Sequence, residues 1–334
     1  AVRSVIETGN MSTLNCPEEV YLAEKLVEMH PWSDMVKFAR SGGEANAIAI
    51  RLARAASRKD NVAICGYHGW HDWYLAANLG DEQNLKGHLL PGLCANGVPE
   101  GLRGTVFPFE YNKFEQLKEL VSTCDIGVIK MEVVRNSEPE DSFLQKIRKL
   151  ATENNIILIF DECTSGFRET YGGIHLKYKV YPDIAMFGKS LGNGFAINAV
   201  VGKKEIMSKA SQSFMSSTFW SERIGYVAAL NTLAEMKKQN SWKKLTKLGL
   251  FFRSKFKLKI DPNFIQLYED GIIPNIRFRF DERNISKKTF IFYMIKEGYL
   301  VSDKFYVSTT HTKKDILKFI NKIKKITSYI HNDF

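Results

Sequence analysis

Three apolar runs in the sequence are each followed directly by side chains that could do chemistry. Asp161 follows the run IILIF, and Lys189 follows DIAMFG. Tyr67 and His68 come just after NVAIC. Short apolar runs of this kind are typical of buried parallel strands, and ligands in open α/β sheets bind outside the carboxyl ends of the strands. We therefore expect a carboxylate, an amine and an aromatic ring to converge on one crevice.

Such a set of groups matches the needs of pyridoxal 5′-phosphate (PLP). The cofactor requires a lysine amine for a Schiff base, an acid beside its pyridine nitrogen, a stacking aromatic ring and donors for a dianionic phosphate. Asp161 beside a pyridinium would make the ring a better electron sink, and Lys189 would be the base that moves the substrate proton. Because desolvation makes a lone carboxylate costly, Asp161 should also have a cationic partner.

A phosphate site is predicted at Ser41, Gly42 and Gly43, which directly precede a predicted helix at residues 44–57. Glycines let the backbone approach a ligand closely. The free N–H groups and the positive end of the helix dipole then favour an anion.

The elements that must position these groups alternate between strand-like and helix-like segments up to about residue 230, which predicts a parallel-rich α/β fold. Shorter strands and helices follow and predict a small α+β domain. The expected domains are a large one over residues 36–235 and a small C-terminal one over residues 236–334. Strands are predicted at residues 61–66, 125–132, 156–162, 183–189 and 196–202, and helices at residues 44–57, 114–122 and 141–154.

Composition limits the remaining function classes. The chain has 334 residues and five scattered cysteines with no CxxC pair, which predicts reduced thiols in the cytoplasm and neither a disulfide framework nor a zinc site. No segment approaches the roughly 18 consecutive apolar residues of a membrane span. The first residues show no signal peptide and read as a truncated start.

The net charge of +10 leaves a non-enzyme alternative, a nucleic-acid-binding protein. Basic residues crowd the stretches SWKKLTKLGLFFRSKFKLKI and HTKKDILKFINKIKKITSYI. Both stretches have the spacing of amphipathic helices, and neither carries interleaved aromatic side chains or a nucleic-acid motif. We therefore interpret the lysines as the solvated faces of two helices and expect no nucleic-acid partner.

The sequence resembles the class III (fold type I) PLP-dependent aminotransferases, in particular the glutamate-1-semialdehyde 2,1-aminomutase-like branch. The resemblance implies a mostly parallel central sheet flanked by helices, with a small α+β C-terminal domain. It also implies that residues 1–35 are the remnant of an N-terminal segment. The matching stretches, in order, are FARSGGEANAIAIRLARA, CGYHGWHDW, IILIFDECTSGFR, PDIAMFGKSLGNGFAINAVVG and SSTFW.

By this resemblance, each matched residue has an expected role at the cofactor. Lys189 would form the Schiff base and Asp161 would contact the pyridine nitrogen. Tyr67 would stack on the ring with His68 beside it. The phosphate would be held by Ser41, Gly42 and Gly43.

Three further positions follow from the same resemblance. Thr218 matches a threonine that reaches the phosphate of the partner subunit, which implies a homodimer with shared active sites. Glu132 matches an active-site glutamate, although Val133 stands where proline usually follows. Cys163 takes the place of an apolar residue that packs against the other face of the ring.

Two reactions remain open. An aminotransferase would move an amino group from a donor, commonly glutamate, to a carbonyl acceptor such as a sugar or cell-envelope precursor. A glutamate-1-semialdehyde-type aminomutase would move the amine within one substrate. Because the stretch FWSERIG departs from the mutase pattern, we favour the aminotransferase.

Overall fold

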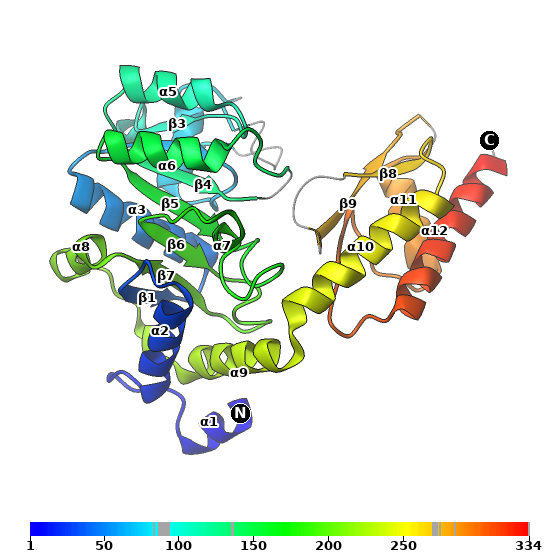
Figure 1. Ribbon diagram of the computed structural model, residues 1–334, viewed down its shortest axis with the longest axis horizontal. Coiled ribbons are helices and arrows are strands. Elements are labelled where there is room, and N and C mark those ends of the chain that lie inside the picture. Colours follow the sequence, from blue (N-terminus) through cyan, green and yellow to red (C-terminus); the bar gives the residue numbers. More distant parts are fainter. Residues whose placement is uncertain are drawn as a thin grey trace. The chain divides into compact units, whose positions relative to one another are not determined.

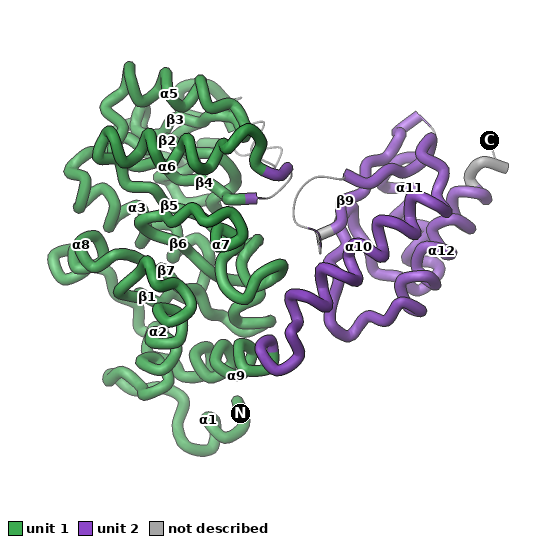
Figure 2. The backbone as a smooth tube through the Cα atoms, in the orientation of Figure 1, with its two compact units in different colours: residues 1–133, 139–235 green, residues 134–138, 236–334 purple. Residues whose placement is uncertain are grey.

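The computed structural model describes residues 1–82, 84–85, 94–134, 137–268, 273, 275–283 and 285–332. The chain divides into two compact units, coloured separately in Figure 2. The first unit contains Ala1–Val133 and Pro139–Glu235, and the second contains Val134–Glu138 and Met236–Phe334. The functional assignment of domains made from the sequence stays a prediction.

Within the described residues, seven strands of the first unit form one sheet in the order β1-β7-β6-β5-β4-β2-β3 (Figure 1). β7 runs antiparallel to β1 and β6, and the other neighbouring strands are parallel. The predicted mostly parallel α/β fold is therefore confirmed. The strands are β1 (Met35–Ala39), β2 (Asn61–Cys65), β3 (Val106–Pro108), β4 (Ile126–Glu132), β5 (Ile157–Glu162), β6 (Ile184–Phe187) and β7 (Asn198–Gly202).

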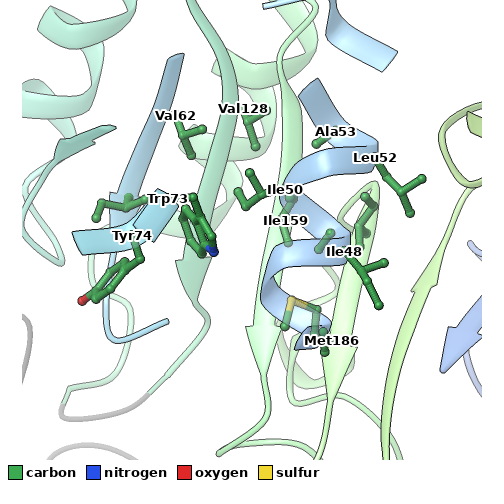
Figure 3. Close-up of a cluster of buried hydrophobic side chains, with 14 of the residues drawn as sticks. Ile48, Ile50, Leu52, Ala53, Val62, Trp73, Tyr74, Val128, Ile159 and Met186 are labelled. Carbon is green, nitrogen blue, oxygen red and sulfur yellow. The ribbon is translucent and has the colours of Figure 1, made fainter. Parts of the chain in front are cut away.

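Helix α3 (Gly42–Ser57) lies along one face of this sheet and contacts β4, β5, β6 and β7. Its apolar side chains, such as Ile48, pack against Ile159 and Met186 of the sheet (Figure 3). The other helices of this unit are α1 (Val2–Thr8), α2 (Pro17–Met29), α4 (Asp72–Leu75), α5 (Phe114–Thr123), α6 (Phe143–Glu153), α7 (His175–Tyr178), α8 (Lys204–Met207) and α9 (Arg223–Gln239), with 3-10 turns η1 (Ala76–Leu79), η2 (Glu100–Leu102), η3 (Ser208–Gln212) and η4 (Thr218–Ser221).

A capping box fixes the start of α3. The Ser41 hydroxyl accepts the N–H of Glu44 at 3.3 Å, and the Glu44 carboxylate accepts the N–H groups of Arg40 and Ser41 at 2.8 and 3.0 Å. These bonds satisfy groups that would otherwise fray the helix end. The helix therefore begins at Gly42, two residues before the predicted start, and its first N–H groups are those of Gly42 and Gly43.

In the second unit, the described residues form a three-stranded antiparallel sheet in the order β10-β9-β8. Aromatic side chains such as Phe252, Phe278 and Phe290 fill its core. Buried residues of the last helix, among them Ile320 and Ile323, pack into the same core. The elements are α10 (Ser241–Lys259), β8 (Ile265–Leu267), β9 (Asn275–Phe280), α11 (Lys287–Lys296), β10 (Lys304–Tyr306) and α12 (Lys313–Asn332).

Candidate active site

The neighbouring strands β4 and β5 both end in a buried carboxylate. Glu132 closes β4, and its register partner in β5 is Asp161. The two residues are only 5% and 4% exposed. Since the strands are parallel, both acids lie at the carboxyl edge of the sheet, where ligands of open α/β folds bind.

Asp161 is held by two hydrogen bonds. One carboxylate oxygen accepts the Nδ1–H of His68 at 2.9 Å, and the other accepts the backbone N–H of Cys163 at 3.1 Å. Burial alone would raise the pKa of Asp161, but the nearby Lys130 ammonium and the His68 hydrogen bond together lower it below its usual range. Asp161 therefore stays ionised in the sheet interior.

Glu162, the next residue, faces the opposite side of the sheet because strand side chains alternate. Its carboxylate accepts the backbone N–H of Ile174 and the Nδ1–H of His175, whose Nε2 accepts the Trp32 N–H at 2.9 Å. Beside this network, burial lowers the pKa of His30 to about 4. Glu162 thus organises the turn before α7, and only the first of the two acids in this strand faces the candidate site.

The loop after β2 is anchored by Glu132. The Tyr67 backbone N–H donates to Glu132 Oε2 at 3.1 Å. Gly66 has φ of +115°, and a Cβ there would lie 2.7 Å from the same oxygen. Only glycine fits at this position, and its turn sends the chain on to Tyr67 and His68. The Tyr67 ring is half-buried and packs edge-on against Tyr74, with ring centroids 6.1 Å apart.

The predicted phosphate residues lie beneath the end of the same loop. A Cβ on Gly43 would lie 2.6 Å from His71 Nε2, and a Cβ on Gly69 would lie 3.6 Å from the Gly43 Cα atom. The glycine therefore lets the loop approach the start of α3. First-turn N–H groups, here those of Gly42 and Gly43, have no acceptor within a helix, so this terminus suits an anion.

Lys189 lies just beyond β6, the strand next to β5. Its backbone φ is +36°, which a residue with a side chain rarely adopts. Its Nζ donates to the hydroxyl of Thr164 at 3.0 Å, three residues after Asp161. Burial and the Asp161 charge raise the pKa of the intervening Cys163 thiol, and the Lys189 charge partly offsets that rise. The structure thus brings the predicted amine and the predicted acid to one edge of the sheet.

Thr218 is exposed at the start of η4. Arg40 fixes this turn by donating to the carbonyl oxygens of Phe219, Trp220 and Glu222 at 2.8, 3.0 and 2.6 Å. Arg40 directly precedes the phosphate residue Ser41. The turn is therefore tied to the helix start while the Thr218 side chain remains exposed.

Three residues near the site were not predicted from the sequence. Thr164 holds the Lys189 amine, and Asn198 Oδ1 accepts the Cys163 thiol at 3.8 Å. Lys130, in the middle of β4, is 0% exposed. A lysine inside the apolar run GVIKM is a signal that sequence reasoning could have used, since buried lysines are rare. Thr164 and Asn198 carry no comparable signal.

Other features of the described residues were compared with this candidate site. A cavity of about 850 Å³ lies at the amino ends of β5 and β6, where Arg148 and Lys203 both pair with Asp183, at 2.8 and 2.7 Å. The described residues contain no cluster of metal-ligating side chains. Among the described helices, none combines the length and apolar character needed to cross a bilayer.

Comparison with known proteins decides the family. The model of the family described as aminotransferase class-III matches residues 2–302. The chain belongs to the class III aminotransferase family. One relative is the 3-aminobutyryl-CoA aminotransferase of Cloacimonas acidaminovorans, 30% identical over 320 residues that cover 91% of this chain and 73% of the relative.

A second relative is named as an aminomutase. The glutamate-1-semialdehyde 2,1-aminomutase of Methanobrevibacter smithii is 32% identical over 337 residues, covering 92% of this chain and 77% of the relative. Among solved structures, the PLP internal aldimine form of Sphingopyxis sp. MTA144 FumI protein superposes with a TM-score of 0.86 at 21% identity, covering 100% of this chain and 80% of that chain. This likeness confirms the fold.

Class III aminotransferases use PLP, and the residues of this chain fit the cofactor. An ionised acid with 4% exposure suits a pyridinium nitrogen. The start of α3, kept open by glycine, suits a phosphate, and Lys189 offers an amine at the same edge of the sheet. The resemblance on which the site was predicted is therefore confirmed at the level of family, fold and cofactor.

Proposed function

We propose that this class III enzyme moves an amino group from an amino donor, with glutamate as the first candidate, to a carbonyl acceptor. The observation that carries the proposal is the buried, ionised Asp161 at the same sheet edge as the Lys189 amine. When bound, PLP supplies an electrophilic carbonyl and an electron-withdrawing pyridine ring.

Each residue of the chain has a proposed task. Asp161 accepts a hydrogen bond from the ring nitrogen and keeps it protonated, supported from behind by His68. Lys189 binds the cofactor covalently and moves the substrate proton. Tyr67 stacks on the ring, and Cys163 packs on the opposite side. The phosphate is bound by Ser41, Gly42 and Gly43 through the start of α3.

Glu132 receives a positioning role in this proposal. Its carboxylate already accepts the Tyr67 N–H, and its bulk lies against Gly66. Glu132 would therefore position the loop that carries Tyr67 at the carboxyl end of the sheet. This role does not require a contact between Glu132 and the substrate.

A spectral screen of amino donors tests the transaminase. We expect glutamate to shift the absorbance of the PLP-loaded protein and to release one equivalent of 2-oxoglutarate per site, and Lys189→Ala protein serves as the blank. Absence of oxo acid with glutamate and a panel of other amines would contradict transamination.

The alternative is an aminomutase that moves the amine within one substrate. It is favoured by the M. smithii relative, which is named glutamate-1-semialdehyde 2,1-aminomutase. Under that alternative, the protein would isomerise its substrate without releasing an oxo acid. A sugar or cell-envelope precursor is the acceptor class that we propose to screen with the transaminase.

The active enzyme is proposed to be a homodimer in which Thr218 of each chain reaches the phosphate site of the partner. Thr218 is exposed, and Arg40 fixes its turn. Two nearby phenylalanines, Phe214 and Phe219, are 88% and 62% exposed in the single chain. Exposed aromatic side chains of this size are typical of surfaces that bind another protein. A cytoplasmic location is proposed because all five cysteines are free thiols.

Mixing two inactive variants tests the shared site. A mixed dimer of Lys189→Ala and Thr218→Val chains would contain one unaltered site, because Lys189 and Thr218 of that site come from different chains. At limiting PLP we expect random mixing to restore about a quarter of the unaltered activity. Failure to exceed the sum of the two parents, in a sample where mass measurement confirms mixed dimers, would exclude the shared site.

A further inference from the structure

Lys130 lies in the middle of β4 on the face of the sheet covered by α3. Its neighbours in register are Ile64 of β2 and Ile159 of β5, and both are fully buried. Its Nζ donates to the sulfur of Met186 at 3.0 Å and lies 6.0 Å from the centre of the Trp73 ring. The ammonium group therefore lies among apolar and polarisable side chains, of which Trp73, Ile159 and Met186 are labelled in Figure 3.

A buried lysine at this position lowers the stability of the folded state. Burial disfavours its charged form and lowers the pKa of Lys130. No carboxylate of the described residues lies within 4.0 Å of its Nζ to form an ion pair. A thioether and an indole ring compensate only part of the lost hydration. An apolar residue like its neighbours would stabilise the core better.

The charged groups around Lys130 belong to the candidate active site. Asp161 lies diagonally ahead of it on β5, on the same face of the sheet, and attracts its charge more than any other group does. Glu132 attracts it less, and His68 donates a hydrogen bond to Asp161. Among these groups, the attraction of Lys130 is the largest effect that keeps the Asp161 pKa low.

We propose that Lys130 is a positioning residue for the reaction: its buried ammonium attracts Asp161 from the interior of the sheet and keeps this carboxylate ionised toward the ring nitrogen of PLP. The inference rests on the proposed function of Asp161. Lys130 touches neither substrate nor cofactor in this role, because it acts only through Asp161.

The test replaces Lys130 by methionine, which has a similar volume and no charge. Without the ammonium, burial raises the pKa of Asp161, so the carboxyl group becomes protonated at low pH and can no longer pair with a pyridinium. We expect PLP titrations of the apoprotein to show an affinity at pH 6 that falls about tenfold relative to pH 8.5, beyond any change in the unaltered protein. The melting temperature of the apoprotein should be unchanged or higher, since a buried charge is lost.

The double variant Lys130→Met/Asp161→Asn shows whether the effect passes through Asp161. With a neutral amide at residue 161, we expect the Lys130 substitution to have no further effect on the pH dependence of PLP affinity. Lys203→Met is the matched control, because it removes a lysine from the opposite end of the same sheet. Lys130→Gln, which is also neutral, should reproduce the profile and replaces Lys130→Met if that variant does not fold.

Each outcome bears on a different claim. An unchanged pH profile in Lys130→Met, or an equal loss with and without Asp161, would overturn the role of Lys130. A destabilised apoprotein with normal PLP affinity would assign Lys130 to folding alone and would also overturn it. If Asp161→Asn by itself binds PLP and reacts normally, the proposed function fails instead.

Discussion

Replacement of Lys189 by alanine is expected to lower the rate of amino transfer by about 10³-fold or more. A positioned acid–base group contributes about 10² to 10⁴-fold, and the covalent bond to the cofactor is lost in addition. The folded state should be little affected, because Lys189 is exposed and its amine bonds only to the Thr164 hydroxyl among the described residues. The measurement is stopped-flow absorbance of the first half-reaction with saturating donor.

Thr164→Val is the matched control for this prediction. It removes the hydroxyl that holds the amine but leaves the amine itself, so we expect a loss of about tenfold. Borohydride reduction of the unaltered protein followed by peptide mass analysis should locate the modified lysine at residue 189. A modified lysine elsewhere, or Lys189→Ala protein within tenfold of the unaltered rate, would refute the assignment.

Asp161→Asn is expected to reduce the same rate by about 10²- to 10³-fold. The amide is nearly the same shape, but it carries no charge to stabilise a protonated ring nitrogen, and electrostatic stabilisation of this kind accounts for such factors in enzymes. It also leaves the cationic Lys130 without its main attraction. Both causes act at the bound ring, so the donor KM should change less than kcat.

The pH dependence gives a second measurement for Asp161. Since its pKa in the folded protein lies below the usual range, the carboxylate is ionised at every pH at which the enzyme is handled. The kcat of the unaltered enzyme should therefore show no acidic limb from this group between pH 5.5 and 8. A carboxyl titration near pH 5 that disappears in Asp161→Asn would contradict the ionised acid described here.

The strands that carry the site could be predicted because each is a short, mostly apolar run. β5 begins one residue after its predicted start and ends at Glu162, as predicted. β1 and β3 were not predicted, since β1 is partly exposed at the sheet edge and β3 has only three residues. Such short runs show too little periodicity to identify a strand.

Within the site, sequence reasoning identified residue types but not contacts. It expected a cationic partner for Asp161, yet it could not say that His68 would donate to it or that Lys130 would lie behind it. Those neighbours come from other strands and loops, and only the register of the sheet brings them together. The same holds for the opposite directions of Asp161 and Glu162, whose partners are far apart in sequence.

The two glycines that admit the aromatic loop also restrict how this enzyme can diversify. A side chain at Gly66 would displace Glu132, and one at Gly43 would displace His71. Either change would lift Tyr67 and His68 together, because both lie on the short segment between these two contacts. Substitutions of these two glycines are therefore disfavoured on the cofactor side of the pocket. A change of substrate preference in proteins descended from this chain must come from segments without such constraints.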